Sequence, residues 1–291
     1  MNLLQIKYFH EVVKHKTLSA AAESMYISQP ALSNAIRELE NEFGLKLFIR
    51  HHGGMELTFE GEQFYSLSKG ILSSEENLKS KMTELSKGRM VLKLGIPPMI
   101  ASILLPEILS GFSDINPNIS LSLTEAGKDE LLKKLKENLI DMAFIPHNSP
   151  ISADFKSEKV TEYEIVCCVS RKTPLSDLKS ITPSHLKNTP IILFKDGFFQ
   201  TGIIKNWFEK YGINPEVLLQ TEQFSTLESL IENNLGAGFV FKKLTEGNPK
   251  LCSVPINEPM LSQVSLVWKK GLNETKANKI FAEFMRGITK I

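Results

Sequence analysis

The chain has 291 residues, with 34 Lys and Arg against 33 Asp and Glu, and a formal net charge of +1. An apolar content of 42% and a charged content of 23% are ordinary for a soluble globular protein, and the length predicts two or three domains. No apolar run approaches the about 20 residues that a membrane span needs, and the nearly neutral balance does not by itself demand a nucleic-acid partner.

The N-terminal segment predicts a helix over residues 3–15, with Ile6, Phe9 and Val13 facing the elements that follow. Lys and Glu residues interrupt its apolar positions, so the segment has the features of neither a signal peptide nor a membrane anchor. We therefore expect a cytoplasmic protein with no membrane partner.

The next stretch has the pattern of two helices joined by a tight turn. Thr17 or Ser19 can cap the first helix and Ser28 the second, because a short side-chain oxygen satisfies free N–H groups there. Pro30 fits the first turn of the second helix, and Gly44 ends that helix. The apolar positions of the first helix are Leu18, Ala21, Ala22 and Met25. Those of the second helix form the stripe Leu32, Ile36, Leu39 and Phe43.

The opposite face of the second helix carries short or forked polar groups, which suit base edges and phosphates. The candidate DNA contacts on it are Gln29, Pro30, Ser33, Asn34 and Arg37. Such a helix fits the major groove of DNA with its N-terminal residues nearest to the bases. The alternative is a packed helix pair with a solvated face, and the first sixty residues are not basic. Acidic residues turned away from DNA, and a dimer that doubles the phosphate contacts, would offset this.

Residues 45–50 and 55–58 predict a two-stranded wing, whose tip would lie on the DNA backbone or in the minor groove. We take Arg50, His51 and His52 as candidate contacts, with an exposed turn as the alternative for the two His residues. The adjacent His residues have no evident third ligand for a metal ion.

Residues 58–87 predict one long helix, without Pro and with a lone Gly at position 70. One column of a coiled-coil seam repeats every seven residues, at Phe64, Ile71, Leu78 and Leu85. The second column is apolar only at its start, at Leu67, Ser74 and Lys81. This pattern favours a short seam packed against neighbouring elements.

Three motifs keep fixed spacings along this region. They are Ser19-x-Ala21-Ala22, Ile27-Ser28-Gln29-Pro30-Ala31-Leu32-Ser33, and Ile36-x-x-Leu39-Glu40-x-x-x-Gly44-x-x-Leu47-Phe48-x-Arg50. With Leu57-Thr58, they resemble the N-terminus of LysR-type transcriptional regulators. The resemblance implies a winged helix-turn-helix DNA-binding domain at 1–58, a linker and dimerisation helix at 59–88 and an effector-binding domain at 89–291. Thr58-Phe59-Glu60-Gly61 departs from the family's usual Thr-x-x-Ala-Gly.

From Met90 onward, strand-like and helix-like segments alternate, which is the pattern of parallel βαβ units. The expected strands are 91–96, 119–125, 141–145, 164–170, 190–194, 217–221, 236–241 and 262–268. The expected helices are 100–112, 130–138, 203–211, 226–233 and 273–287. Gly95, Pro106, Phe112, Pro117 and Leu139-x-Asp141 resemble the effector domain of the same family.

The family's effector domain is similar to periplasmic solute-binding proteins, which have two α/β lobes joined by two crossing strands. The resemblance therefore implies a multi-domain chain with this two-lobed α/β fold at its C-terminal end. We expect lobe I at 89–162 and 266–291, and lobe II at 163–265.

In open α/β sheets, ligands bind where strands end and helices begin. Helix N-termini there favour anions, so we expect a small anionic or polar metabolite as the effector. The candidate contacts are Pro98, Met99, Ile100, Lys128, Pro146, Phe198, Gln200, Thr201 and Thr226. The alternatives are a solvated lysine at position 128 and a core or lobe-interface role for Phe198 and Phe199.

The sequence contains no Gly-x-Ser-x-Gly, His-Glu-x-x-His or phosphate-binding Gly-rich motif, so we expect no catalytic residue, enzyme activity, metal or cofactor. Cys167 and Cys168 are adjacent in a predicted buried strand, where neighbouring side chains point to opposite faces. This arrangement, and the lack of zinc-like spacing to Cys252, favours small buried hydrophobic residues over a redox sensor.

The resemblance implies a ligand-responsive regulator. A homodimer, or a homotetramer assembled from it, would bind two half-sites in promoter DNA. The effector would change the relative pose of the lobes, and thereby DNA bending and contact with RNA polymerase. The alternative is a cytoplasmic solute-binding or enzyme-like α/β protein whose helix-turn-helix is only a packing module.

Overall fold

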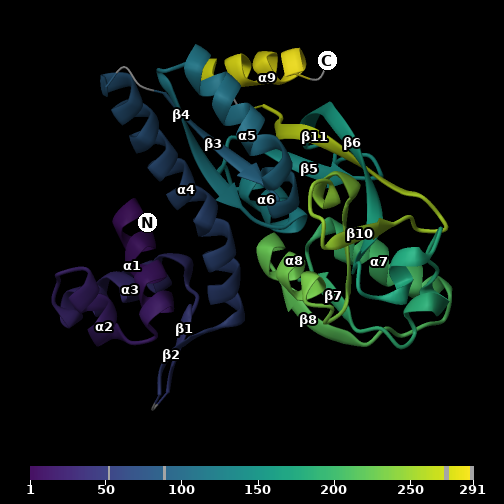
Figure 1. The fold of residues 1–291 in the computed structure, drawn as a ribbon. Coiled ribbons are helices and arrows are strands. Elements are labelled where there is room, and N and C mark those ends of the chain that lie inside the picture. The colour runs from purple at the N-terminus through teal and green to yellow at the C-terminus, as the bar shows by residue number, and fades with distance from the viewer. Residues whose placement is uncertain (52, 88–89, 272–274, 289–291) are drawn as a thin grey trace. The chain divides into compact units, whose positions relative to one another are not determined.

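The computed structural model describes residues 1–51, 53–87, 90–271 and 275–288 (Figure 1). The chain divides into two compact units, residues 1–83 and 84–291. Each unit is described below by itself.

The first unit begins with α1 (Leu3–His15), α2 (Leu18–Ser24) and α3 (Gln29–Phe43). A side-chain oxygen caps each helix N-terminus: those of Asn2, Thr17 and Ser28 accept backbone N–H groups. Ser28 is the predicted cap, and of the two alternatives Thr17 and Ser19 the structure has Thr17. Pro30 lies in the first turn of α3, and Gly44 ends that helix with a φ of 65°, a conformation that glycine adopts at little cost.

The predicted wing follows as an antiparallel hairpin of β1 (Phe48–His51) and β2 (Gly54–Leu57). The core of this unit contains Phe9, Val12, Leu18, Ala21, Ala22, Leu32, Ile36, Leu39, Leu47 and Phe48. Phe43 was expected at the end of the apolar stripe of α3 but is 45% exposed. As the last residue of the helix, it leaves the core where the chain turns, and its ring meets only the edge of the cluster at Phe64, 6.0 Å between centroids.

The long helix α4 (Phe59–Lys87) changes character along its length. Phe64 packs into the core, with its ring centroid 4.8 Å from that of Phe9. Further along, Leu67, Ile71 and Leu78 are 76%, 42% and 62% exposed. The side chains of Lys81 and Leu85, which the heptad pattern also includes, lie outside the described part of the chain. Only the start of the predicted seam is therefore covered by the described residues of this unit.

The second unit is built on one sheet, which has nine strands in the described residues (Figure 1). Their order is β4-β3-β5-β11-β6-β9-β7-β8, with β10 paired to β6. The strands are β3 (Met90–Ile96), β4 (Ile119–Glu125), β5 (Met142–His147), β6 (Phe155–Ser170), β7 (Ile191–Phe194), β8 (Val217–Thr221), β9 (Ala237–Phe241), β10 (Leu251–Val254) and β11 (Met260–Lys269). The helices are α5 (Pro98–Ile115), α6 (Lys128–Lys136), α7 (Phe199–Lys210), α8 (Phe224–Glu232) and α9 (Lys276–Ile288), with short 3-10 turns at Pro174–Asp177, Pro183–Leu186 and Lys242–Thr245.

The sheet contains two parallel regions, and each is the centre of one lobe. In lobe I, β3 lies between β4 and β5; in lobe II, β7 lies between β8 and β9. The long strands β6 and β11 run antiparallel between them and form the predicted crossing. The two lobes therefore share one hydrogen-bonded sheet.

The sequence pattern missed the first half of β6 and all of β10. A strand was expected only from residue 164, whereas β6 begins at Phe155. Between these points Lys and Glu residues dominate, and only Phe155 and Val160 are buried. Pairing with β11, from Phe155↔Lys269 to Ile165↔Met260, holds this polar segment extended. The partner strand thus outweighs the weak local preference for a strand.

Helix α5 corrects one expectation about apolar runs. Its 18 residues have a mean hydropathy of 1.3, so by length and composition it could cross a membrane. Met99, Ile100, Leu104, Ile108 and Phe112 of this helix are instead buried in the core of the second unit. A core helix that faces apolar neighbours has the same composition as a membrane span of this length.

Candidate functional site

The N-terminal half of α3 presents the polar face that the sequence predicts. Gln29, Pro30, Asn34 and Arg37 are exposed, and Ser33 is half-buried beside them. The buried stripe of the same helix lies on its opposite side, so α3 is fixed in the unit while this face stays open. Within it, the Arg37 guanidinium donates to the Asn34 side-chain oxygen.

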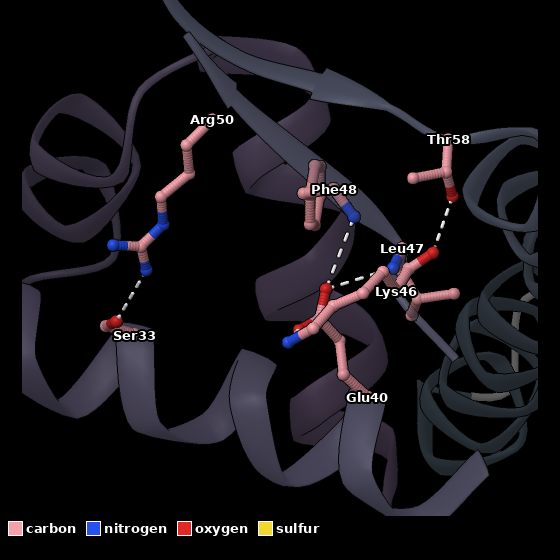
Figure 2. Close-up of polar contacts among 7 residues, drawn as sticks. All are labelled: Ser33, Glu40, Lys46, Leu47, Phe48, Arg50 and Thr58. Atoms are coloured by element: carbon pink, nitrogen blue, oxygen red, sulfur yellow. Dashed lines mark hydrogen bonds and ion pairs between the residues drawn. The ribbon is translucent and has the colours of Figure 1, made fainter. Parts of the chain in front are cut away.

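A residue of the wing reaches this face (Figure 2). Arg50 of β1 donates from Nη2 to the Ser33 hydroxyl at 3.2 Å, and the Arg50 side chain is exposed. His51 is also exposed, with Nε2 3.6 Å from a Glu56 carboxylate oxygen. His52, the remaining predicted wing contact, lies outside the described residues. The structure thus brings a predicted wing contact and a predicted helix contact together.

Glu40 joins α3 to the wing, a role that sequence reasoning missed (Figure 2). One carboxylate oxygen accepts the backbone N–H groups of Leu47 at 2.9 Å and Phe48 at 3.3 Å, and the other is 2.8 Å from Lys46 Nζ. Glu40 is only 8% exposed. Burial by itself raises the pKa of this carboxyl, but the hydrogen bonds from Lys46, Leu47 and Phe48 outweigh burial and lower the pKa overall. An acidic residue one turn after Ile36, on the buried side of the helix, was the available signal.

The second strand of the wing is also held, at the end next to the hairpin turn. The Met55 N–H donates to the Lys16 carbonyl at 2.7 Å. Gly54 has a φ of 133°, and a Cβ there would lie 2.4 Å from the same carbonyl oxygen. Only glycine permits this close approach, so the turn between α1 and α2 sets the direction in which the hairpin leaves the unit.

Several acidic residues of the first unit are engaged by groups away from the polar face of α3. The Glu38 carboxylate accepts from the Gln5 side chain, and Glu42 pairs with the N-terminal ammonium group. Glu11 lies 3.6 Å from Lys14 Nζ and accepts from the Ser24 hydroxyl. These pairings reduce the repulsion that a phosphate backbone at α3 would meet.

In the second unit, a cleft of about 300 Å³ lies where the two lobes meet. Its lining residues are Pro98, Glu125, Ala126, Gly127, Glu130, Lys195, Asp196, Gly197, Phe198, Glu222 and Gln223. The Asp129 N–H of lobe I donates to the Gly197 carbonyl of lobe II at 3.3 Å. A Cβ at position 127 would lie 2.8 Å from that carbonyl oxygen, so glycine lets the lobes touch.

An adjoining groove of about 600 Å³ shares part of this lining. Pro98, Glu125, Glu222 and Gln223 belong to both. The groove continues along α5 and the start of α8, where its apolar residues are Leu105, Leu109 and Phe224.

The predicted effector contacts divide into two groups. Pro98 and Phe198 line the cleft. Met99 and Ile100 are 2% and 0% exposed in the lobe core, so the structure contradicts their expected place at the cleft. They were expected there because they follow Pro98, but the helix turns their side chains toward the sheet.

The other predicted contacts have partners or positions away from the cleft lining. Lys128 Nζ lies 5.3 Å from the centroid of the Phe199 ring. The Thr201 hydroxyl donates to the Phe194 carbonyl at 2.8 Å, and Thr226 donates to Gln223 Oε1 at 3.3 Å. Pro146 and Gln200 are buried.

Four charged cleft residues that sequence reasoning missed lie at the end of a strand or directly after it, and three of the four are acidic. Glu125 ends β4, Lys195 and Asp196 follow β7, and Glu222 follows β8. Because the carboxyl ends of parallel strands meet at one edge of a sheet, the position of these residues was the available signal.

His147 lies at the end of β5 and is 8% exposed. Its Nδ1 is 2.9 Å from the Ser149 carbonyl oxygen, and its Nε2 is 2.9 Å from the Ser265 hydroxyl. Burial lowers its pKa below the usual 6.5. Both ring nitrogens are engaged, so this side chain links β5 to β11.

The cysteines show no arrangement for a disulfide. Cys168 is paired with Ser253 and Cys252 with Val169, so the Cys168 and Cys252 side chains point to opposite faces of the sheet. Burial raises the pKa of Cys168 to about 12 and that of Cys167 well above its usual range. Within the described residues, no group of three or more His, Cys, Asp or Glu side chains could hold a metal ion.

Two family models match the chain. Residues 3–62 match the bacterial regulatory helix-turn-helix protein, lysR family, and residues 86–289 match the LysR substrate binding domain. The uncharacterised HTH-type transcriptional regulator YwbI of Bacillus subtilis is 29% identical over 278 residues, which cover 93% of this chain and 91% of that protein.

Two solved structures with the same fold are complexes, one with DNA and one with a small ligand. Full-length CbnR in complex with its target DNA matches with a TM-score of 0.73 at 21% identity, over 100% of this chain and 99% of that one. The regulatory domain of CcmR from Synechocystis PCC6803, in complex with 2-PG, matches with a TM-score of 0.63 at 17% identity, over 69% of this chain and 98% of that one.

Proposed function

Because the chain belongs to the LysR family of DNA-binding transcriptional regulators, we propose that it binds promoter DNA through the start of α3 and the wing. The observation that carries this proposal is the exposed set Gln29, Pro30, Asn34 and Arg37, joined to the wing by the Arg50–Ser33 hydrogen bond. Amide and hydroxyl groups on an exposed helix start suit base edges, and Arg37 and Arg50 suit phosphates.

The cleft between the lobes is the proposed effector site. It lies at the carboxyl ends of strands from both lobes, so a ligand there touches both and changes their relative pose. CcmR in complex with 2-PG supports a small-molecule ligand for this fold. Among the predicted contacts, Pro98 and Phe198 are the ones retained for direct contact, because both line the cleft.

The exposed residues of α4 support self-assembly. Leu67, Ile71, Leu78 and Met82 are all at least 42% exposed, and they follow one another at helical spacing along the described part of α4. Pairing of two α4 helices would cover these side chains in a homodimer, and dimers would associate into a homotetramer. Each dimer holds two DNA-binding units, which matches recognition of two half-sites.

The proposal also covers the setting in which the protein works. We place it in the cytoplasm, where it acts as a regulator and not as an enzyme, and where its promoter complex contacts RNA polymerase. A packing-only role for the helix-turn-helix, the alternative considered for the sequence, fits poorly with the family match over residues 3–62.

Fluorescence anisotropy with a labelled duplex from the region upstream of the protein's own gene tests the proposal. We expect tight binding to this duplex, weaker binding to a scrambled duplex of equal length, and loss of affinity as salt increases. Equal affinity for both duplexes at every salt concentration would contradict sequence-specific recognition.

A further inference from the structure

We propose that the cleft between the lobes selects a small organic monocation, an amine or guanidine with an apolar part. This inference rests on the proposed function, because it assigns a ligand class to the effector site named there. The helix dipoles led to the expectation of a small anionic or polar metabolite, whereas this ligand class is inferred from the side chains that line the cleft.

The cavity itself defines the site. It occupies about 300 Å³, it is bounded by residues of both lobes, and it lies in the domain that matches the LysR substrate binding domain. Gly127 and Gly197 approach each other at its edge, so its walls belong to separate lobes. A ligand enclosed in this cavity therefore contacts both lobes.

Carboxylates dominate the charged lining. They are Glu125, Glu130, Asp196 and Glu222, whereas Lys195 is the one basic residue among the described lining residues. An excess of side chains of one sign in a cleft attracts ligands of the opposite sign.

Lysines already neutralise three of these carboxylates. Lys195 Nζ is 2.8 Å from Glu222 and Lys134 Nζ is 3.2 Å from Glu130. Lys205 Nζ pairs with Asp196. The side-chain carboxylate of Glu125, at the end of β4, has no ion-pair or hydrogen-bond partner among the residues that the structure describes. One carboxylate in the lining is thus left without a cationic partner, which favours a ligand with a single positive charge.

The helix starts offer an anion little in return. α5 begins at Pro98 with Pro97 as its N-cap, and neither proline has an N–H group, so this helix start has fewer donors than usual. At α6, the Asp129 N–H is used by the Gly197 carbonyl, and the acidic residues of its first turn occupy the positive end of the helix dipole. Asp196 lies shortly before α7. Lys128 is held near the Phe199 ring and does not line the cleft.

Apolar surface flanks the unpaired carboxylate on two sides. Phe198 lines the cleft and stacks on Phe194, with centroids 5.2 Å apart and an interplanar angle of 22°. The adjoining groove, which shares Glu125, continues to Leu105 and Leu109. An ammonium or guanidinium group at Glu125 would therefore carry an apolar substituent against one of these surfaces.

Isothermal titration calorimetry on the full-length assembled protein tests the proposal. The amine probes are phenethylamine, 3-methylbutylamine and butylguanidine, and the acid probes of similar shape are 3-phenylpropionate and 4-methylpentanoate. We expect amine probes to bind with an affinity that falls as salt increases, and acid probes not to bind.

A pair of variants tests whether Glu125 is the residue that binds the cationic group. Glu125→Gln keeps the size of the side chain and removes its charge, and we expect it to weaken amine binding at least about tenfold. Glu209→Gln, at an exposed position on α7, is the matched control and should leave amine binding unchanged. Thermal unfolding of both variants, compared with the parent, shows that they fold.

Three results would overturn the proposal: binding of acid probes without amine probes, absence of binding for every amine probe, or equal amine affinity in the parent and Glu125→Gln. Ligand-free binding to the upstream duplex by the same preparations tests the proposed function separately. An acid probe that binds and shifts DNA affinity would exclude the monocation while leaving the regulator in place.

Discussion

The carboxylate of Glu40 accepts the backbone N–H of Leu47 at 2.9 Å and thereby ties the helix proposed to enter the DNA groove to the first strand of the wing. This contact passes through a side chain that is nearly fully buried. This carboxylate is therefore one of the contacts that orient the wing relative to α3, which has consequences for stability and for DNA binding.

Replacement of Glu40 should destabilise the first unit. Glu40→Ala leaves the Leu47 and Phe48 N–H groups without their acceptor, which costs about 1–3 kcal/mol per buried group. Glu40→Gln keeps one acceptor oxygen and should cost less. Chemical denaturation with a probe in the first unit measures both, with Glu38→Ala at an exposed position of α3 as the control. Equal stability of Glu40→Ala and Glu38→Ala would show that the hydrogen bonds contribute nothing.

The same carboxylate predicts a pH dependence. Its pKa in the folded protein lies below the ordinary 4.5, so folding favours the charged form. The stabilisation it provides is fully present above pH about 4.5 and is lost as the pH falls through the lower folded value. The difference in unfolding free energy between the parent and Glu40→Gln, measured from pH 7 down to pH 3, should therefore shrink in the acidic range. A difference that grows on acidification would mean that folding raises the pKa of Glu40 instead of lowering it.

Gln29→Ala tests base readout. Gln29 is exposed at the start of α3, where it accepts from the Ser19 hydroxyl at 3.1 Å, so its amide is already positioned. Its loss should cost about 1–3 kcal/mol at the cognate duplex and less on random DNA. Asn41→Ala, at an exposed position near the other end of α3, should change neither affinity. Similar losses on cognate and random duplexes would remove Gln29 from base recognition.

Leu78→Asp tests assembly through α4. Leu78 is 62% exposed, and a charge there would have to be desolvated when two helices pair. In sedimentation experiments, we expect the variant dimer to dissociate at a higher protein concentration than the parent dimer. We also expect the variant to bind the upstream duplex more weakly. Leu235→Asp places the same charge at an exposed leucine of the second unit and should have no such effect. If the Leu78→Asp variant remains a dimer, the contact between the two chains does not include Leu78.

Gly127→Ala tests the contact between the lobes. The added Cβ would meet the Gly197 carbonyl oxygen at 2.8 Å, so the two lobes must separate or shift. Thermal unfolding of the second unit should occur at a lower temperature, and ligand response should weaken. Gly202→Ala is the matched control, because a Cβ in that helix meets nothing within 4 Å and should be neutral or slightly stabilising. Identical behaviour of the two variants would show that the lobes do not need this close approach.

The first unit could be predicted from sequence because its signals are local. Caps at Thr17 and Ser28, the glycine at 44 and the apolar stripe of α3 each fix one helix boundary or face without reference to distant residues. Phe43 is the exception. Its exposure depends on the path of the chain after the helix ends, and the apolar periodicity of the helix carries no information about that path.

The cleft was harder to predict because its residues come together only through the sheet. Strand ends and helix starts were recognised, but the side chains at the helix starts point into the core, as for Met99 and Ile100. The polar residues directly after the strands, such as Glu125 and Glu222, line the cleft instead. Their pairing with lysines on other elements was not visible in the sequence, so the charge of the site could not be inferred.

The crossing strands set the order in which the second unit is completed during synthesis. Lobe I contains the first strands of the unit, yet β5 pairs with β11 through Gln263↔His147, and Phe281 of α9 packs against Phe112 and Phe144. The ribosome therefore synthesises the whole of lobe II before it synthesises the end of β11 and α9, which complete lobe I. Until then, one edge of β5 and the apolar side of α5 remain uncovered on the nascent chain, available to chaperones.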